Sequence, residues 1–238
     1  MRTDRQAGEL RPLGMEPGVM KFADGSVLVK LGDTHVLCAV TLEDGVPGWR
    51  RGTGQGWLTA EYSMLPAATS ERGAREAARG RQTGRTQEIQ RLIGRSLRAV
   101  TDLGSLGERT VHIDCDVVQA DGGTRTASIS GAYAALVLAL QKRSELERWE
   151  RLPLFEDVAA VSVGVVDGQP LLDLDYAEDA AAELDMNVVM TGAGRLIEVQ
   201  ATAEGEPFGR ETLDRLLDLA AAGVARIVEA QQAVIAGA

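Results

Sequence analysis

The chain has 238 residues, of which 45% are hydrophobic and 25% charged, and its formal net charge is −10. This composition is ordinary for a soluble globular protein and allows a core of normal size. No apolar run reaches ~18 uninterrupted residues, so we expect no membrane span, and the N-terminal sequence MRTDRQAGELRP lacks the apolar segment of a secretory signal.

The predicted elements alternate between strands and helices along the whole chain. In chain order they are a hairpin (26–31 and 34–43), a short strand (58–64), an arginine-rich mobile loop or short helix (67–83), a helix (86–103), a strand (110–119), a helix (127–143), two hairpins (158–174 and 183–203) and a long amphipathic helix (211–235). This order predicts an α+β fold in which two related halves pack into one compact unit over residues 1–238.

Two cysteines are the chain's only thiols, and both fall in strand-like runs. Cys38 and Cys115 have no partner at metal-ligand spacing. Buried free thiols in a reducing compartment fit this pattern better than a disulfide or a metal site. We therefore expect a cytoplasmic protein.

A glycine-rich junction between the strand at 110–119 and the following helix carries the clearest chemical signal. Its sequence is DGGTRTAS, from Asp121 to Ser128. Glycines at a helix N-terminus let free N–H groups approach an anion, which the helix dipole also favours. Arg125 adds a planar fork for phosphate oxygens and Thr124 adds a hydroxyl donor. The same glycines could instead serve only a tight turn.

Charge is distributed unevenly along the sequence. Residues 49–109 carry a net charge of +5, and all of their basic residues are arginine. This basic segment favours a polyanionic partner in spite of the acidic whole chain. A solvated surface in an arginine-biased protein is the alternative interpretation.

An acidic cluster spans the connection between the predicted hairpins at 158–174 and 183–203. Its six carboxylates are Asp173, Asp175, Glu178, Asp179, Glu183 and Asp185. Oxygen ligands at this density suit Mg²⁺ or Mn²⁺, which usually take one or two carboxylates together with substrate phosphates. A solvated acidic loop is about equally compatible with the pattern.

Four segments together resemble the ribonuclease PH family. They are RGTGQGWLTAEYSMLPAAT (Arg51–Thr69), GRTQEIQRLIGRSLRAV (Gly84–Val100), GERTVHIDCDVVQADGGTRTASISGA (Gly107–Ala132) and LLDLDYAEDAAAELDMNVVMTG (Leu171–Gly192). The similarity runs from Glu9 to the final helix. It implies the ribonuclease PH fold, two pseudo-repeated βαβα-type halves, and a ring-shaped homohexamer built as a trimer of dimers.

The resemblance also implies an activity: phosphate-dependent 3′-to-5′ trimming of RNA, notably tRNA precursors. Inorganic phosphate would be the co-substrate and attacking group, and nucleoside diphosphates would be released reversibly. By the same resemblance, the bound phosphate contacts Arg85, Gly123, Thr124 and Arg125. Asp179 and Asp185 match the acidic pair that holds Mg²⁺ or Mn²⁺, and one of them could instead protonate the leaving oxygen. Asp173 and Asp175 would only orient the strand end.

RNA binding should come from the basic segment. Arg72 and Arg75 match family arginines that hold tRNA, whereas a basic residue common just upstream is replaced here, where Ala67 follows Pro66. Arg95 and Arg98 share a predicted helix face and could line the path of the RNA end, or could be a solvated face or a subunit contact. Aromatic residues make up only 4%, so base stacking should contribute little to recognition.

Two other functions have to be weighed against this one. A non-catalytic, RNA-binding ring subunit would be marked by loss of the arginines or aspartates, yet Arg85, Arg125, Asp179 and Asp185 are all present. A two-metal hydrolytic nuclease would need no phosphate loop and would act without phosphate.

Overall fold

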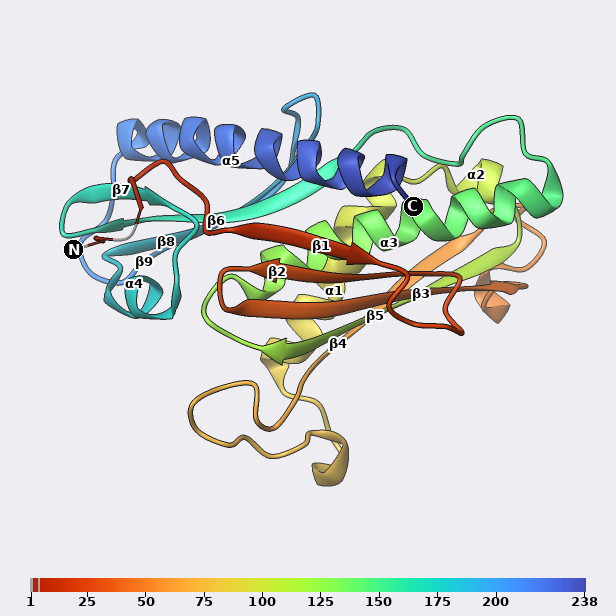
Figure 1. Cartoon of the computed structure of the whole chain (residues 1–238), viewed down its shortest axis with the longest axis horizontal. Coiled ribbons are helices and arrows are strands. Elements are labelled where there is room, and N and C mark those ends of the chain that lie inside the picture. Colours follow the sequence, from red (N-terminus) through yellow and green to blue (C-terminus); the bar gives the residue numbers. More distant parts are fainter. Residues whose placement is uncertain (1, 4) are drawn as a thin grey trace.

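The computed structural model of the chain describes residues 2–3 and 5–238. Two β-sheets and three long helices dominate this described part (Figure 1). The strands are β1 (Leu13–Pro17), β2 (Gly25–Leu31), β3 (Thr34–Asp44), β4 (Trp57–Met64), β5 (Arg109–Gln119), β6 (Val158–Val166), β7 (Gln169–Leu172), β8 (Leu184–Thr191) and β9 (Leu196–Ala203). The helices are α1 (Gly84–Val100), α2 (Leu103–Leu106), α3 (Thr124–Glu147), α4 (Tyr176–Ala181) and α5 (Arg210–Ala236), with short 3₁₀ turns η1 (Gly48–Arg50) and η2 (Ala77–Arg79).

The first sheet has the strand order β1-β2-β3-β5-β4, in which only β4 and β5 run parallel. Alternation along β5 buries Val111, Ile113 and Val117 on one face, and helices α1 and α3 cover that face. Helix α3 approaches closely because position 131 is glycine. A Cβ there would lie 2.3 Å from Val29 Cγ2 and 2.8 Å from Cys38 Sγ.

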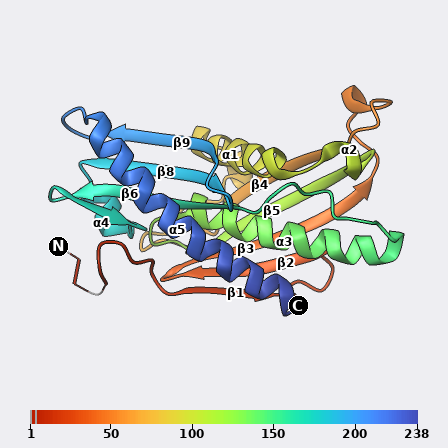
Figure 2. The ribbon, with the colours of Figure 1, turned by 90° about the horizontal axis from the view of Figure 1, so that it is seen from above.

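The second sheet, in the order β7-β6-β8-β9, is antiparallel throughout. Every residue of β6 is buried, because α3 packs on one face of the sheet and α5 on the other. Figure 2 shows α5 crossing over β6 and continuing beside α3 toward β1. By length and composition alone α5 could cross a membrane, and here its apolar side packs on the second sheet through Leu216, Ala220 and Val224.

The structure confirms the predicted α+β class and most predicted elements, with shifted ends. Helix α3 begins at Thr124, three residues before the predicted start, and α1 ends at Val100, with α2 as a separate turn. Strand β1 and helix α4 were not predicted. Residues 67–83 form a protruding loop containing only the turn η2. Cys38 and Cys115 are buried and form no disulfide, as expected for core thiols. They lie opposite each other in the register of β3 and β5.

Candidate active site

A cleft of about 380 Å³ lies between the first turns of α1 and α3 and the second sheet. Its lining includes Arg85, Gly123, Thr124, Arg125, Asp179 and Asp185. The structure therefore brings together all six residues that the sequence predicts for phosphate and metal binding. Three further polar residues, Ser162, Asn187 and Glu204, line the same cleft and were missed because each stands alone in its strand or strand end.

Two helix N-termini converge on this cleft. Helix α1 begins beside Thr83, whose hydroxyl accepts a hydrogen bond from the Thr86 amide at 3.2 Å, and Arg85 lies in the first turn. Helix α3 begins after Gly123, which has a φ of 67° and offers no side-chain cap. Its first amide N–H groups have no partner within the helix and remain available for an anion. The start of α3 thus lines the cleft through Gly123 and Thr124, and the first turn of α1 contributes the side chain of Arg85.

The two predicted phosphate arginines differ in how they are held. Arg125 is partly buried, and its Nη1 lies 3.2 Å from Gln200 Oε1 and 3.5 Å from Glu88 Oε1. Gln200 in turn donates to Glu88 at 3.1 Å. Arg85 is exposed and makes no hydrogen bond or ion pair with any residue that the structure describes. One arginine is thus pre-positioned by its neighbours, and the other is free to close on a ligand.

Tyr62 lies behind Thr124, on the arginine side of the cleft. Its ring is 4% exposed, and its hydroxyl lies 2.9 Å from Thr124 Oγ1. Burial raises the pKa of Tyr62, so the phenol keeps its proton and can donate this hydrogen bond. Thr124 then has its own proton free to donate into the cleft.

The acidic side of the cleft comes from the second half of the chain. Asp179 lies on α4 and Asp185 on β8. Partial burial raises the pKa of Asp179, and the negative charge of Glu204 adds to this against the lowering effect of Arg85 and Arg125. The pKa of Asp185 is raised by partial burial, then by Asp179 and Glu204. Neighbouring carboxylates of this kind favour a bound cation or a shared proton.

These carboxylates fit a hard divalent ion only if other oxygens complete its coordination. Among the residues that the structure describes, no group of three or more His, Cys, Asp or Glu side chains is arranged to hold a metal. Two carboxylates are nevertheless what Mg²⁺ usually takes from a protein when substrate phosphates supply the rest. The donor set therefore fits Mg²⁺ or Mn²⁺ bound together with substrate.

The other members of the acidic cluster have structural partners. Asp173 is buried against Arg11 at 2.7 Å. Asp175 caps α4, and Glu178 accepts from Arg2 at 2.6 Å. Glu183 accepts from the Gly168 amide at 2.9 Å. The solvated acidic loop that the sequence alone allowed therefore does not describe Asp173, Asp175 or Glu178, which are buried or half-buried, whereas Glu183 is exposed.

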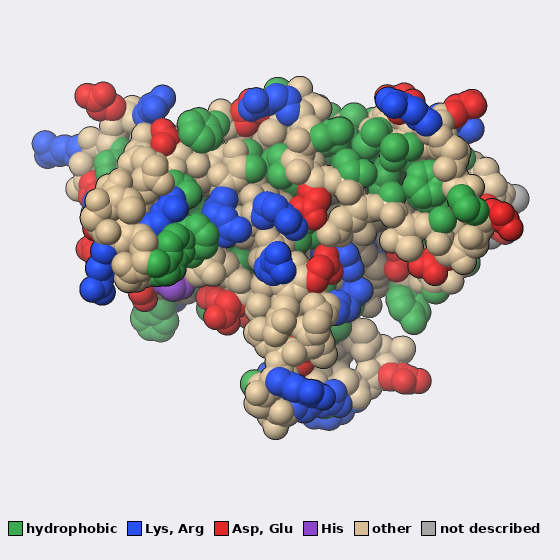
Figure 3. All heavy atoms as spheres, turned by 180° about the vertical axis from the view of Figure 1, so that it is seen from behind, with side chains coloured by type: hydrophobic (Ala, Val, Ile, Leu, Met, Phe, Trp, Pro, Cys, Tyr) green, Lys and Arg blue, Asp and Glu red, His purple; other side chains and the backbone are tan. Residues whose placement is uncertain are grey.

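The predicted tRNA arginines lie apart from the cleft, on the protruding loop. Arg72 and Arg75 are exposed there, and Figure 3 shows Lys and Arg side chains gathered at the tip of this loop. Ala67 lies at its base. Glu76 accepts hydrogen bonds from Thr83 and Thr86, which ties the loop to the start of α1. The loop is therefore anchored beside the cleft while its arginines reach into solvent.

Arg95 and Arg98 point to different neighbours in spite of their helical spacing. Arg95 forms an ion pair with Glu198 on β9 at 2.6 Å. Arg98 donates to the Leu58 carbonyl on β4 at 2.9 Å and lies over the Trp57 ring at 4.7 Å. Neither lines the cleft as the structure describes it. The two arginines lie close enough for Arg95 to lower the pKa of Arg98, after the larger lowering effect of burial, but their side chains pair with strands β9 and β4; their contact with RNA stays a prediction.

Comparison with known families identifies the chain. Residues 9–140 match the model of the 3′ exoribonuclease family, domain 1, and residues 158–223 match domain 2 of the same family. The chain belongs to the ribonuclease PH family. The domain 1 match ends within α3 and the domain 2 match begins at β6. The cleft of this ribonuclease PH family member lies between the two matched regions, because residues of both line it.

Solved structures agree with the family fold. The rice (Oryza sativa) Rrp46 structure is 21% identical with a TM-score of 0.79, and the match covers 98% of both chains. A chain of the Archaeoglobus fulgidus exosome with RNA bound to the active site is 22% identical, with a TM-score of 0.78, over 94% of this chain and 90% of that one. A chain of an archaeal exosome core is 23% identical, with a TM-score of 0.76, over 96% of this chain and 89% of that one. At these identities the likeness establishes the fold.

Proposed function

We propose that this ribonuclease PH family member is a phosphate-dependent 3′-to-5′ exoribonuclease that trims tRNA precursors and other RNA. The observation that carries the proposal is the single cleft in which Arg85, Arg125 and the start of α3 face Asp179 and Asp185. A non-catalytic subunit would have no need of this convergence.

The proposed reaction joins two phosphates that repel each other. An oxygen of inorganic phosphate attacks the phosphorus of the last diester, the bond from that phosphorus to the preceding 3′ oxygen breaks, and a nucleoside diphosphate leaves. The 3′ oxygen takes up a proton. Arg85, Arg125 and the amides after Gly123 hold the attacking phosphate and reduce the repulsion. Because no strong base is needed to make phosphate a nucleophile, positioning and charge neutralisation are the main tasks of the cleft.

The acidic pair serves the diester side of the reaction. Asp179 and Asp185 would hold Mg²⁺ or Mn²⁺, which when bound neutralises charge on the diester. The raised pKa of each carboxyl also suits an aspartic acid that protonates the leaving 3′ oxygen. Metal titration at fixed pH distinguishes the two roles, because only the first requires a divalent ion.

Substrate binding extends beyond the cleft. Arg72 and Arg75 on the protruding loop would hold the tRNA body through its phosphates, with little dependence on sequence. Alanine at position 67 removes one cation from this loop, so affinity for tRNA, and not chemistry, would be affected. Arg95 and Arg98 would contribute only after leaving their present partners.

Assembly completes the proposal. We infer a cytoplasmic homohexamer, a trimer of dimers, that gathers the basic loops of neighbouring subunits around shared RNA paths. Light scattering tests the mass against the 25.3 kDa chain. A monomer that trims tRNA at full rate would refute this part.

One assay tests the reaction itself. A tRNA with a short 3′ extension is incubated with and without inorganic phosphate, and the released mononucleotides are identified. We expect nucleoside 5′-diphosphates only when phosphate is present, and extension of the RNA when diphosphates are in excess. Monophosphates released in phosphate-free buffer would indicate the hydrolytic nuclease, and RNA binding without any release would indicate the non-catalytic subunit.

A further inference from the structure

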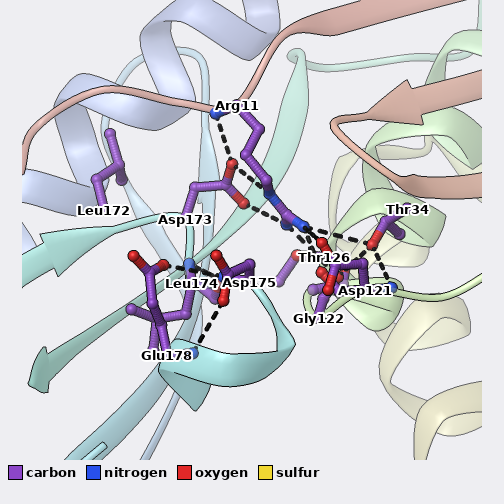
Figure 4. Close-up of polar contacts among 12 residues, drawn as sticks. Arg11, Thr34, Asp121, Gly122, Thr126, Leu172, Asp173, Leu174, Asp175 and Glu178 are labelled. Carbon is purple, nitrogen blue, oxygen red and sulfur yellow. Dashed lines mark hydrogen bonds and ion pairs between the residues drawn. The ribbon is translucent and has the colours of Figure 1, made fainter. Parts of the chain in front are cut away.

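An arginine near the N-terminus lies buried between the two sides of the cleft. Arg11 is 4% exposed and comes from the segment just before β1. Figure 4 shows its guanidinium extending from Asp173 on one side to Asp121 and Gly122 on the other. It does not line the cleft that the structure describes. Arg11 therefore touches neither substrate position but contacts both segments that carry the site.

The contacts with the acidic side are made by a fully buried carboxylate. Arg11 Nε donates to Asp173 Oδ2 at 3.0 Å and Nη2 to Oδ1 at 2.7 Å, and the Arg11 backbone amide also donates to Oδ2 at 2.8 Å. Asp173 stands two residues before the cap of α4, at a φ of 57°. These hydrogen bonds fix the segment that leads into α4, the helix that carries Asp179.

The contacts with the phosphate side go to backbone carbonyls of the glycine loop. Arg11 Nη1 donates to the Asp121 carbonyl, and Nη2 lies 3.4 Å from the Gly122 carbonyl. Buried Thr34 assists: its hydroxyl donates to the Gly122 carbonyl at 2.6 Å and accepts from the Asp121 amide at 2.9 Å. The loop is thus held immediately before Gly123, where the anion-binding end of α3 begins.

The glycine loop and the segment before α4 are also in direct contact, so they cannot move closer together. A Cβ at Gly122 would lie 2.6 Å from both the Leu174 carbonyl oxygen and the Asp175 carbonyl carbon. The Tyr176 amide lies 3.3 Å from Asp121 Oδ1. A shift of either segment therefore moves the other.

From these contacts we infer that Arg11, Thr34 and Asp173, the Arg11 clamp, set the distance between the phosphate-binding loop and the carboxylates of the cleft. Arg11 is then a positioning residue: it acts through Gly123–Arg125 and Asp179. This inference rests on the proposed function for its kinetic consequence. A buried ion pair adds little net stability compared with well-packed apolar side chains, so its effect should be on geometry.

The test replaces the guanidinium of Arg11 by an amine that carries the same charge. Arg11→Lys has one nitrogen where the clamp uses three, so it cannot span Asp173 and both carbonyls. We expect the KM for inorganic phosphate to rise and kcat to fall, together by about tenfold to a hundredfold in kcat/KM, because a small misplacement of reacting groups has effects of this size. The KM for RNA should stay near the wild-type value.

Arg109→Lys is the matched control. Arg109 also pairs with a carboxylate, Glu147 at 2.7 Å, and donates to a backbone carbonyl, Leu106 at 2.8 Å, but near α2, away from the cleft. The same chemical change there should leave phosphate kinetics unaltered. Thr34→Val removes the hydroxyl from the clamp without removing charge, and Thr34→Ser should restore most of the lost phosphate use.

Amide hydrogen exchange gives a readout that does not depend on activity. Exchange should rise together at residues 121–126 and 173–179 in Arg11→Lys and in Thr34→Val, and at neither segment in Arg109→Lys. If both clamp variants match the control in phosphate kinetics and in exchange, the inference is overturned. If wild-type protein degrades no RNA, the proposed function fails, and the exchange comparison still decides whether the clamp couples the two segments.

Discussion

Removing one hydroxyl beneath the cleft tests whether Thr124 is a prepared phosphate ligand. In Tyr62→Phe the ring stays buried and only the 2.9 Å contact with Thr124 Oγ1 is lost. A neutral hydrogen bond of this kind contributes about 0.5–1.5 kcal/mol. The Thr124 hydroxyl then turns to another acceptor for part of the time, so the KM for inorganic phosphate should rise about two- to tenfold. Phosphorolysis of a short RNA at varied phosphate concentration measures this.

Tyr133→Phe is the matched control, because Tyr133 is 3% exposed and its hydroxyl donates to Asp157 Oδ1 at 2.7 Å. The hydrogen bond there goes to a carboxylate and contributes about 1.5–3 kcal/mol, so this variant should lose more stability in thermal unfolding. It should keep the wild-type KM for phosphate. If the two variants change that KM equally, or Tyr62→Phe does not change it, the assigned role of Tyr62 is wrong.

Four further outcomes are expected. Arg85→Ala or Arg125→Ala should reduce phosphorolysis about 10²–10³-fold, as for loss of one oxyanion donor, with an unchanged thermal midpoint; near-normal activity at limiting phosphate would contradict the role. Asp179→Asn or Asp185→Asn should raise the Mg²⁺ requirement or abolish turnover while RNA binding changes little, and an unchanged metal titration would exclude a metal-binding role. Calorimetry should show that Mg²⁺ and phosphate each raise the affinity for the other; independent binding would refute a shared site. Gly131→Ala should destabilise the fold by about 1–3 kcal/mol through overpacking, and an unshifted denaturant midpoint would contradict the packing of α3.

The strands and long helices could be predicted because their signals are local. The alternation from Thr110 to Gln119 requires only the two faces of one strand, and it recovers β5 to within a residue. Strand β1 gives no such signal, since its five residues include Gly14 and Pro17 and lie at a sheet edge. Helix α4 has six residues and no apolar stripe, although the capping box formed by Asp175 and Glu178 marks its start in the sequence.

The candidate site was predicted only in its outline. Family motifs give the predicted residues that line the cleft, but the residues that hold them come from distant strands without a motif. Tyr62 and Gln200 are of this kind: each contacts a predicted phosphate residue across a separation of 62 or 75 positions. The helical period correctly places Arg95 and Arg98 near each other along α1. It does not predict that Arg95 pairs with Glu198 on β9 and that Arg98 donates to the Leu58 carbonyl on β4.

The charge pattern explains why the cleft must lie between the two halves. The first half supplies the positive groups through Arg85, Arg125 and the start of α3, and the second supplies Asp179 and Asp185. Either set alone would attract only one of the two partners that the proposed reaction needs, a phosphate or a divalent ion. Brought to one cleft, each set offsets part of the other's charge before any ligand binds, as the lowering effect of Arg125 on the pKa of Asp185 indicates, although burial, Asp179 and Glu204 raise that pKa. In the proposed reaction the contact between the halves is therefore part of the chemistry, and for this reason whole-chain charge, which is acidic, says little about the ligand.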